Sequence, residues 1–213
     1  MTYALPGTTH QLVELPDGIT LSVYEAAPAE VAADRPVVVF SHGFPELAFS
    51  WRQQLAAASA AGYRAVAPDQ RGYGGSSRPE AVTDYDIHHL TGDLVALLDH
   101  LGVERAVFVG HDWGGFVVWQ MPLLHPDRVA GVVGVNTPYI PRLPIRPTEV
   151  FRMAGGDGMY ILEFQEPGVA DEILLRDVPG LYDALFRTAR SPEEMAEAAA
   201  ANPYVPGGPT TFE

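Results

Sequence analysis

The chain has 213 residues, 47% of them hydrophobic, which suffices for one globular domain or for one domain and part of another. The net charge of −14 opposes binding to the phosphate backbone of nucleic acids, and the absence of cysteine excludes disulfides, thiolate zinc sites and a cysteine nucleophile. All 13 basic residues are arginine, so a Walker lysine and a Schiff-base lysine are excluded as well.

The hydrophobic pattern alternates between strands and helices from the amino terminus to Pro138. Six segments are predicted to be strands: two in residues 10–26 around a Pro16-Asp17-Gly18 turn, then one each in 35–43, 63–69, 105–112 and 127–138. Three segments are predicted to be helices: 47–63 ending near Gly62, 88–101 closed by Gly102, and the residues that follow Asp112. This alternation predicts an α/β fold, a mostly parallel sheet with helices on both faces.

The amino-acid composition changes after Pro138. The stretch "YIPRLPIRP" is too rich in proline for a continuous helix or a central strand, and residues 150–200 have a helical composition. There, "SPEEMAEAAAA" has a serine N-cap and an acidic first turn. We therefore predict two regions, 1–138 and 139–213, with the second one helical.

The stretch "FVGHDWGGF" matches a nucleophile elbow, a sharp strand–turn–helix that usually carries serine in G-x-S-x-G. Here Asp112 occupies the nucleophile position. Gly110 and Gly114 are expected to relieve crowding at the turn, and Gly115 to allow close packing of the helix. The plain alternative is that Asp112 only caps the helix.

Two further loops follow predicted strands. In "SHGFPE" and at the elbow, the backbone N–H groups of Phe44 and Trp113 are the expected oxyanion-hole donors, and Pro45 allows a cis bond after Phe44. The loop "DQRGYGGSSRP" lacks the lysine of a phosphate-binding loop, so we interpret it as a structural turn on the same side of the sheet.

An aspartate at the elbow favours attack on saturated carbon. It would form an alkyl ester that water can cleave at the enzyme's own carbonyl, whereas serine would leave a stable ether. The leaving group is then a halide or the oxygen of an epoxide, and the epoxide oxygen requires a proton donor such as a phenol. Tyr160 is a candidate, four residues before Phe164 and therefore on one helical face with it.

In this order, "SHGFPE", "DQRGYGGSSRP", "GHDWGG" and "YILEFQEPGVAD" closely resemble the soluble epoxide hydrolases of the α/β-hydrolase superfamily. The resemblance covers nearly the whole chain. It implies that Asp112 is the nucleophile, that Phe44 and Trp113 form the oxyanion hole, and that Tyr160 is the first of two cap tyrosines that protonate the epoxide oxygen. It also implies that residues 139–213 are part of a helical cap, and that neither cofactor nor metal is needed.

The resemblance also implies a base histidine and an acid after the nucleophile. The only later histidine is His125, about 18 Å away along a helix of 1.5 Å rise per residue. For His42 and His111 we favour local structural roles, and we give a metal at His88 and His89 little weight. We therefore expect the acid, the base and the last core strands outside these 213 residues, and poor turnover by this chain alone.

Other functions stay open at this point. A haloalkane or haloacid dehalogenase would use the same Asp112, and a non-catalytic homologue would use the pocket to bind a small ligand. The expected partners are a small apolar epoxide and water. No secretory signal or apolar run of membrane-span length occurs, so we expect a cytoplasmic protein. A homodimer is left open.

Overall fold

The computed structural model describes residues 3–30, 35–156, 159–186 and 191. Contacts between Cα atoms divide the chain into two compact units, residues 1–140 and 141–213, each described separately below. The division falls two residues after the predicted boundary at Pro138, and the assignment of the second unit to a cap stays a prediction. No helix in the described ranges has the length and apolar character that crossing a bilayer requires.

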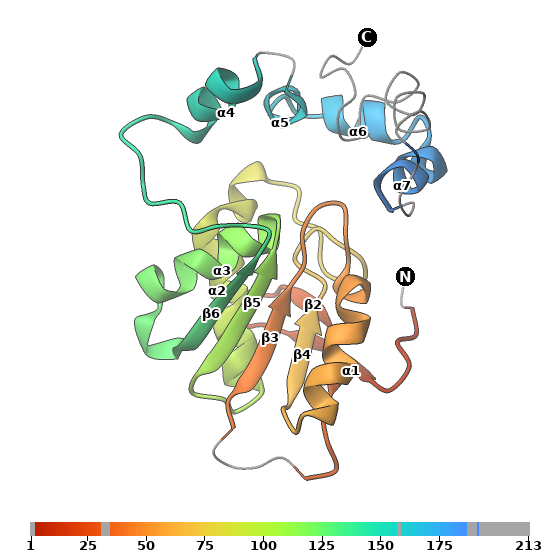
Figure 1. Ribbon diagram of the computed structural model, residues 1–213, viewed down its shortest axis with the longest axis vertical. Helices are drawn as coiled ribbons and strands as arrows, with labels where there is room; N and C mark the ends of the chain where they lie inside the picture. Colours follow the sequence, from red (N-terminus) through yellow and green to blue (C-terminus); the bar gives the residue numbers. More distant parts are fainter. Residues whose placement is uncertain (1–2, 31–34, 157–158, 187–190, 192–213) are drawn as a thin grey trace. The chain divides into compact units, whose positions relative to one another are not determined.

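The first unit is built on a six-stranded sheet in the order β1-β2-β4-β3-β5-β6 (Figure 1). The strands are β1 (Thr9–Glu14), β2 (Thr20–Ala26), β3 (Val37–Ser41), β4 (Ala65–Pro68), β5 (Ala106–His111) and β6 (Val129–Val135). β1 and β2 pair antiparallel around the predicted turn, and β2 pairs antiparallel with β4. β4, β3, β5 and β6 are parallel neighbours, so the predicted α/β fold with a mostly parallel sheet is confirmed.

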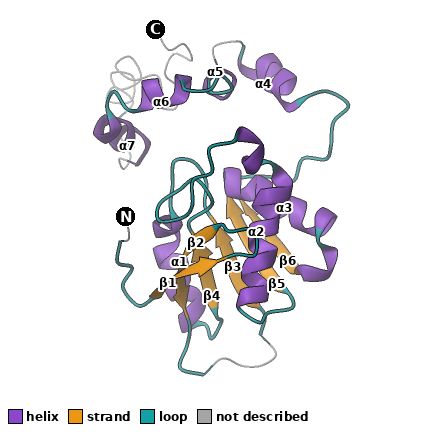
Figure 2. Cartoon of the chain, turned by 180° about the vertical axis from the view of Figure 1, so that it is seen from behind, coloured by secondary structure: helices purple, strands orange, loops and turns teal. Residues whose placement is uncertain are grey.

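Helices cover both faces of this sheet. The helical elements of the first unit are η1 (Ala48–Trp51), α1 (Arg52–Ala60), η2 (Val82–Tyr85), α2 (Ile87–His100), α3 (Trp113–Leu124) and η3 (Pro126–Arg128). Figure 2 shows α2 and α3 against one face, with α1 on the other. The predicted helix over 47–63 therefore begins with a 3-10 turn, in which Ser50 N–H bonds Leu47 C=O three residues back.

Each strand contributes to two cores because successive side chains point to opposite faces. Val39 and Val66 pack with the leucines of α2, whereas Phe40 and Ala67 pack with Leu55 of α1. In α2, Leu94, Leu97 and Leu98 are buried, which confirms the helical face predicted from their spacing. Gly62 and Gly102 end α1 and α2 with positive φ angles of 87° and 67°.

The second unit contains helices in its described part: α4 (Pro147–Gly155), α5 (Tyr160–Glu163), α6 (Val169–Leu174) and α7 (Val178–Phe186). Pro147 opens α4 and Gly156 follows it with φ 75°, a usual pair of helix boundaries. The helix predicted from "SPEEMAEAAAA" lies outside the described residues except for Ser191.

Candidate active site

Asp112 lies between the end of β5 and the start of α3, in a strained backbone conformation with φ 51° and ψ −122°. The space around Gly110 and Gly114 explains why glycine flanks Asp112. At Gly110 a Cβ would contact the backbone of Gly114, and at Gly114 it would contact the carbonyl oxygens of Ser41 and His42. The predicted reason for these glycines is therefore confirmed: the turn has no room for a side chain at either position.

The Asp112 carboxylate faces the loop after β3. Its Oδ1 accepts a hydrogen bond of 2.9 Å from the backbone N–H of Phe44, and within the described residues it makes no capping bond to α3. A Cβ at Gly43 would lie 2.5 Å from the Asp112 Cβ and 2.7 Å from its Oδ1. Because Ser41 pairs with Gly110 in the parallel β3–β5 ladder, the two loops leave the sheet side by side. The carboxylate thus points at the expected oxyanion hole and does not serve as a helix cap.

Trp113 is the first residue of α3, so its N–H is one of the first four, which have no acceptor inside the helix. Its ring lies 5.5 Å from the ring of Phe116, and the two residues are 42% and 36% exposed. They provide an apolar surface directly after Asp112. The Phe44–Pro45 peptide bond is cis.

His42 supports the oxyanion loop from within the core. Its Nε2 accepts a hydrogen bond of 3.0 Å from Gln70 N–H, which leaves the proton on Nδ1 to be donated to Gly43 C=O at 2.9 Å. The Gln70 side-chain amide donates to His42 C=O in return. Complete burial lowers the pKa of His42, so it is neutral and has the local structural role expected.

Glu46 is a residue to which the sequence interpretation gave no role. Its Oε2 accepts a hydrogen bond of 3.0 Å from Gly43 N–H and lies 3.1 Å from the Nδ1 of His111. It therefore joins the loop after β3 to the end of β5. The sequence did hold a signal for this role: the carboxylate of Glu46 stands two residues after Phe44, where it can accept a hydrogen bond from an N–H group of the same loop.

Asp69 organises the turn "DQRGYGGSSRP" after β4. Its buried carboxylate accepts hydrogen bonds from Tyr3 Oη at 2.7 Å, Ala48 N–H at 2.9 Å and Gly75 N–H at 3.1 Å. Burial and the neighbouring carboxylate raise the pKa of Tyr3. These contacts, together with those of Gln70, agree with the predicted structural turn beside the site.

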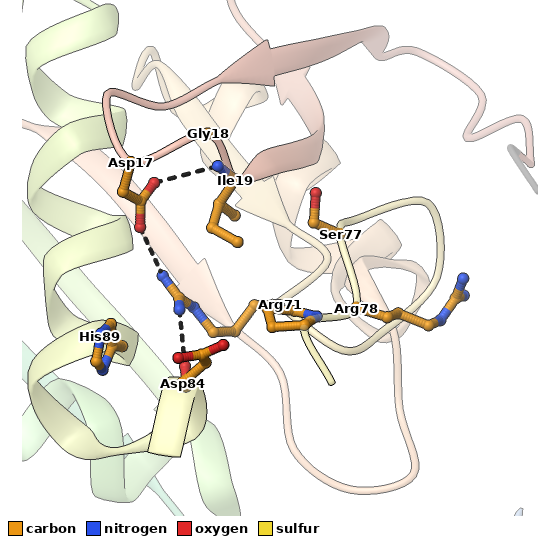
Figure 3. Close-up of a pocket in the computed structure, with 9 residues that line it drawn as sticks. Asp17, Gly18, Ile19, Arg71, Ser77, Arg78, Asp84 and His89 are labelled. Carbon is orange, nitrogen blue, oxygen red and sulfur yellow. Dashed lines mark hydrogen bonds and ion pairs between the residues drawn. The ribbon is translucent and has the colours of Figure 1, made fainter. Parts of the chain in front are cut away.

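A separate pocket of about 530 Å³ lies where the β1–β2 turn meets the loop after β4 (Figure 3). Arg71 and His89 in its lining are both paired with carboxylates. Arg71 contacts the carboxylates of Asp93 and Asp17 and the carbonyl of Asp84, and His89 pairs with Asp86. Asp112 does not line this pocket, so it is not the candidate active site.

Tyr160 begins α5 in the second unit. Its ring lies 5.6 Å from the ring of Phe164 in an edge-to-face arrangement, which confirms that the two share one helical face. Its expected role as proton donor stays a proposal.

His125 follows α3 at the end away from Asp112. Its Nε2 lies 3.2 Å from Thr91 Oγ1, and burial lowers its pKa. The twelve residues of α3 separate it from Asp112 by about 18 Å along the helix axis. This arrangement agrees with the interpretation that His125 is not the base.

Comparisons with known proteins indicate the family to which the chain belongs. A family model described as the alpha/beta hydrolase fold matches residues 36–195. Epoxide hydrolase A of Mycobacterium tuberculosis (strain ATCC 25618 / H37Rv) is 53% identical over 191 residues, which are 89% of this chain and 58% of that protein. Bifunctional epoxide hydrolase 2 of Sus scrofa is 40% identical, over 87% of this chain and 34% of that protein.

Solved structures give the same result. Epoxide hydrolase A from Mycobacterium thermoresistibile has a TM-score of 0.79 and 49% identity, over 89% of this chain and 59% of that one. Epoxide hydrolase VrEH1 from Vigna radiata has a TM-score of 0.77 and 42% identity, over 90% of this chain and 57% of that one. The chain thus spans less than two thirds of the length of these relatives, all of which are named epoxide hydrolases. Because the family model matches most of its length and the fold and elbow agree, the chain belongs to the α/β-hydrolase fold family.

Proposed function

We propose that the protein is an epoxide hydrolase that opens a small apolar epoxide to a vicinal diol through an ester on Asp112. The observation that carries the proposal is the carboxylate at the nucleophile elbow, bonded at Oδ1 to the N–H of Phe44. The relatives named epoxide hydrolases support this function over a dehalogenase or a non-catalytic binder.

In the first step, an oxygen of the Asp112 carboxylate attacks an epoxide carbon, and the bond from that carbon to the ring oxygen breaks. The leaving oxygen takes a proton from the Tyr160 hydroxyl and becomes the first hydroxyl of the product. Trp113 and Phe116 supply apolar surface for the substrate.

In the second step, water attacks the carbonyl carbon of the ester. The negative charge develops on the carbonyl oxygen, where the N–H groups of Phe44 and Trp113 stabilise it. The ester C–O bond then breaks on the carboxyl side, and the departing oxygen takes the proton that the base removed from water to become the second hydroxyl. The carboxylate re-forms with one oxygen from water as the remaining water proton returns to the Tyr160 phenolate. The base that activates this water, and its acid partner, are expected outside residues 1–213.

The test is intact mass spectrometry after incubation with styrene oxide. The full-length protein should produce diol and, in a single turnover in heavy-oxygen water, should carry the label on Asp112. Residues 1–213 alone should retain a persistent adduct on Asp112. If the full-length protein produces neither adduct nor diol with a panel of epoxides, the proposal is wrong.

Tyr160 also separates the proposal from a dehalogenase, since halide leaves without a proton. The cytoplasmic location and a homodimer are predictions that accompany this function, to be tested by cell fractionation and by light scattering.

A further inference from the structure

Thr137 lies behind the elbow, just after β6. It is 5% exposed, and the residue before it, Asn136, has a positive φ of 55°, which turns the chain back towards α3. The Thr137 hydroxyl donates a hydrogen bond of 3.2 Å to the backbone carbonyl of Asp112. The carbonyl of Thr137 accepts one of 2.8 Å from the indole N–H of Trp119 on α3.

Two glycines pack closely against Thr137. A Cβ at Gly115 would lie 2.5 Å from the Thr137 Cβ and 2.7 Å from its Oγ1. At Gly134 a Cβ would contact the Thr137 carbonyl and lie 2.6 Å from the Trp119 indole nitrogen. Two glycines therefore allow β6 and α3 to approach the threonine closely, and its hydroxyl is held against the elbow.

The carbonyl that Thr137 bonds belongs to the same peptide unit as the N–H of Trp113. A peptide unit is planar, so holding the Asp112 oxygen in place also sets the direction of the Trp113 N–H on the opposite side. A hydrogen bond accepted by the oxygen polarises the unit as well, which strengthens the N–H as a donor. The Trp113 N–H is the second expected donor of the oxyanion hole.

We infer that Thr137 is a positioning residue that aims and strengthens the Trp113 N–H for hydrolysis of the ester on Asp112. The inference rests on the proposed function. Its effect belongs to the second step, because only there does full negative charge develop on the carbonyl oxygen. Attack on the epoxide depends chiefly on the carboxylate and the proton donor, so the first step should be nearly unaffected.

Thr137→Val tests this with little change of shape. The Asp112 carbonyl keeps the N–H of Phe116 as a donor at 3.2 Å, so no buried acceptor is orphaned and the variant should fold. In the full-length protein with styrene oxide, the rate of ester hydrolysis should fall about tenfold, less than the 10²–10³-fold typical of a lost oxyanion-hole donor. The alkylation rate should stay within about twofold, so the alkyl-enzyme accumulates and kcat falls more than kcat/KM.

Thr137→Ser is the matched control, since it keeps the hydroxyl and removes the methyl group. It should restore the hydrolysis rate. If Thr137→Ser slows hydrolysis as much as Thr137→Val, or if Thr137→Val slows both steps equally, packing explains the residue and the inference is wrong.

A second measurement does not depend on activity. In Thr137→Val, the amide ¹⁵N and ¹H resonances of Trp113 should shift, since its peptide unit has lost a hydrogen bond, and in Thr137→Ser they should not. An unchanged Trp113 resonance in Thr137→Val overturns the inference. Absence of alkylation and diol in the unmodified full-length protein counts against the proposed function instead.

Discussion

The backbone N–H of Phe44 and the carboxylate of Asp112 form a hydrogen bond of 2.9 Å across 68 residues of sequence. The bond exists because β3 and β5 are adjacent parallel strands, and their loops leave the sheet at the same edge. It gives the Asp112 carboxylate a fixed direction and, under the proposed function, places a donor where the second reaction step develops charge.

Gly43→Ala should disable this arrangement without unfolding the protein. The new Cβ would lie 2.5 Å from the Asp112 Cβ, so the nucleophile must move. We expect a loss of about 10²-fold or more in kcat/KM, as for a small misplacement of reacting groups. Gly92→Ala is the control, because its Cβ would meet nothing within 4 Å. It should retain activity and stabilise α2 by about 0.5–1 kcal/mol. Equal activity of both variants would contradict the prediction.

Tyr160→Phe should remove the proton donor for the epoxide oxygen. We expect diol formation from styrene oxide to fall by about 10²–10⁴-fold, the usual contribution of a general acid, with the adduct on Asp112 reduced in parallel. Tyr63→Phe is the matched control, since that tyrosine lies before β4 beside Arg35. Stopped-flow kinetics of both variants provide the measurement. Normal alkylation in Tyr160→Phe would assign the acid role elsewhere.

The buried pair of Arg71 and Asp93 should be important for stability. Arg71 bonds both carboxylate oxygens, at 2.7 and 2.5 Å, with side chains 2% and 6% exposed. Arg71→Met leaves a buried carboxylate without its partner and should cost about 3–5 kcal/mol of unfolding free energy.

Its control is Asp99→Asn, which breaks the ion pair between Asp99 and Arg128. The Asp99 side chain in this pair is 64% exposed. That change should cost less than about 1 kcal/mol. Urea unfolding followed by circular dichroism measures both values. A similar small loss in Arg71→Met would show that the buried pair contributes no more than a surface pair.

His42 should make the protein sensitive to acid. Burial lowers its folded-state pKa below the ordinary value, so below about pH 6.5 the unfolded chain binds more protons than the folded one. Stability should therefore fall as the pH drops from about 6.5, by up to about 1.4 kcal/mol per pH unit for this group.

His125 contributes in the same direction, because burial lowers its pKa as well. His125→Asn should remove only its share of the pH dependence measured by urea unfolding. The ring resonances of His42 should stay those of the neutral, Nδ1-protonated form at pH 6.5. Protonation of His42 above that pH would contradict the assignment.

The sequence was sufficient for the six strands and the three α-helices of the first unit, and for the strand–turn–helix that carries Asp112. Strand and helix periods are local properties, and the leucine spacing in α2 predicted the face that is buried. The glycines around Asp112 are also a local signal. A nucleophile elbow is so crowded that some of its positions accept only glycine. The 3-10 turn at Ala48 was not predicted. The N–H of Ala48 bonds the carboxylate of Asp69, which is 21 residues away in the sequence.

The residue types at the elbow alone led to the proposed chemistry: a carboxylate in the nucleophile position, where it would attack saturated carbon, between glycines that permit a sharp turn. Only the tertiary structure decided which groups support it. Glu46 meets His111 across 65 residues and Thr137 meets Asp112 across 25. No local pattern encodes these contacts, because they depend on the order β3-β5-β6, which brings three loops to one edge of the sheet.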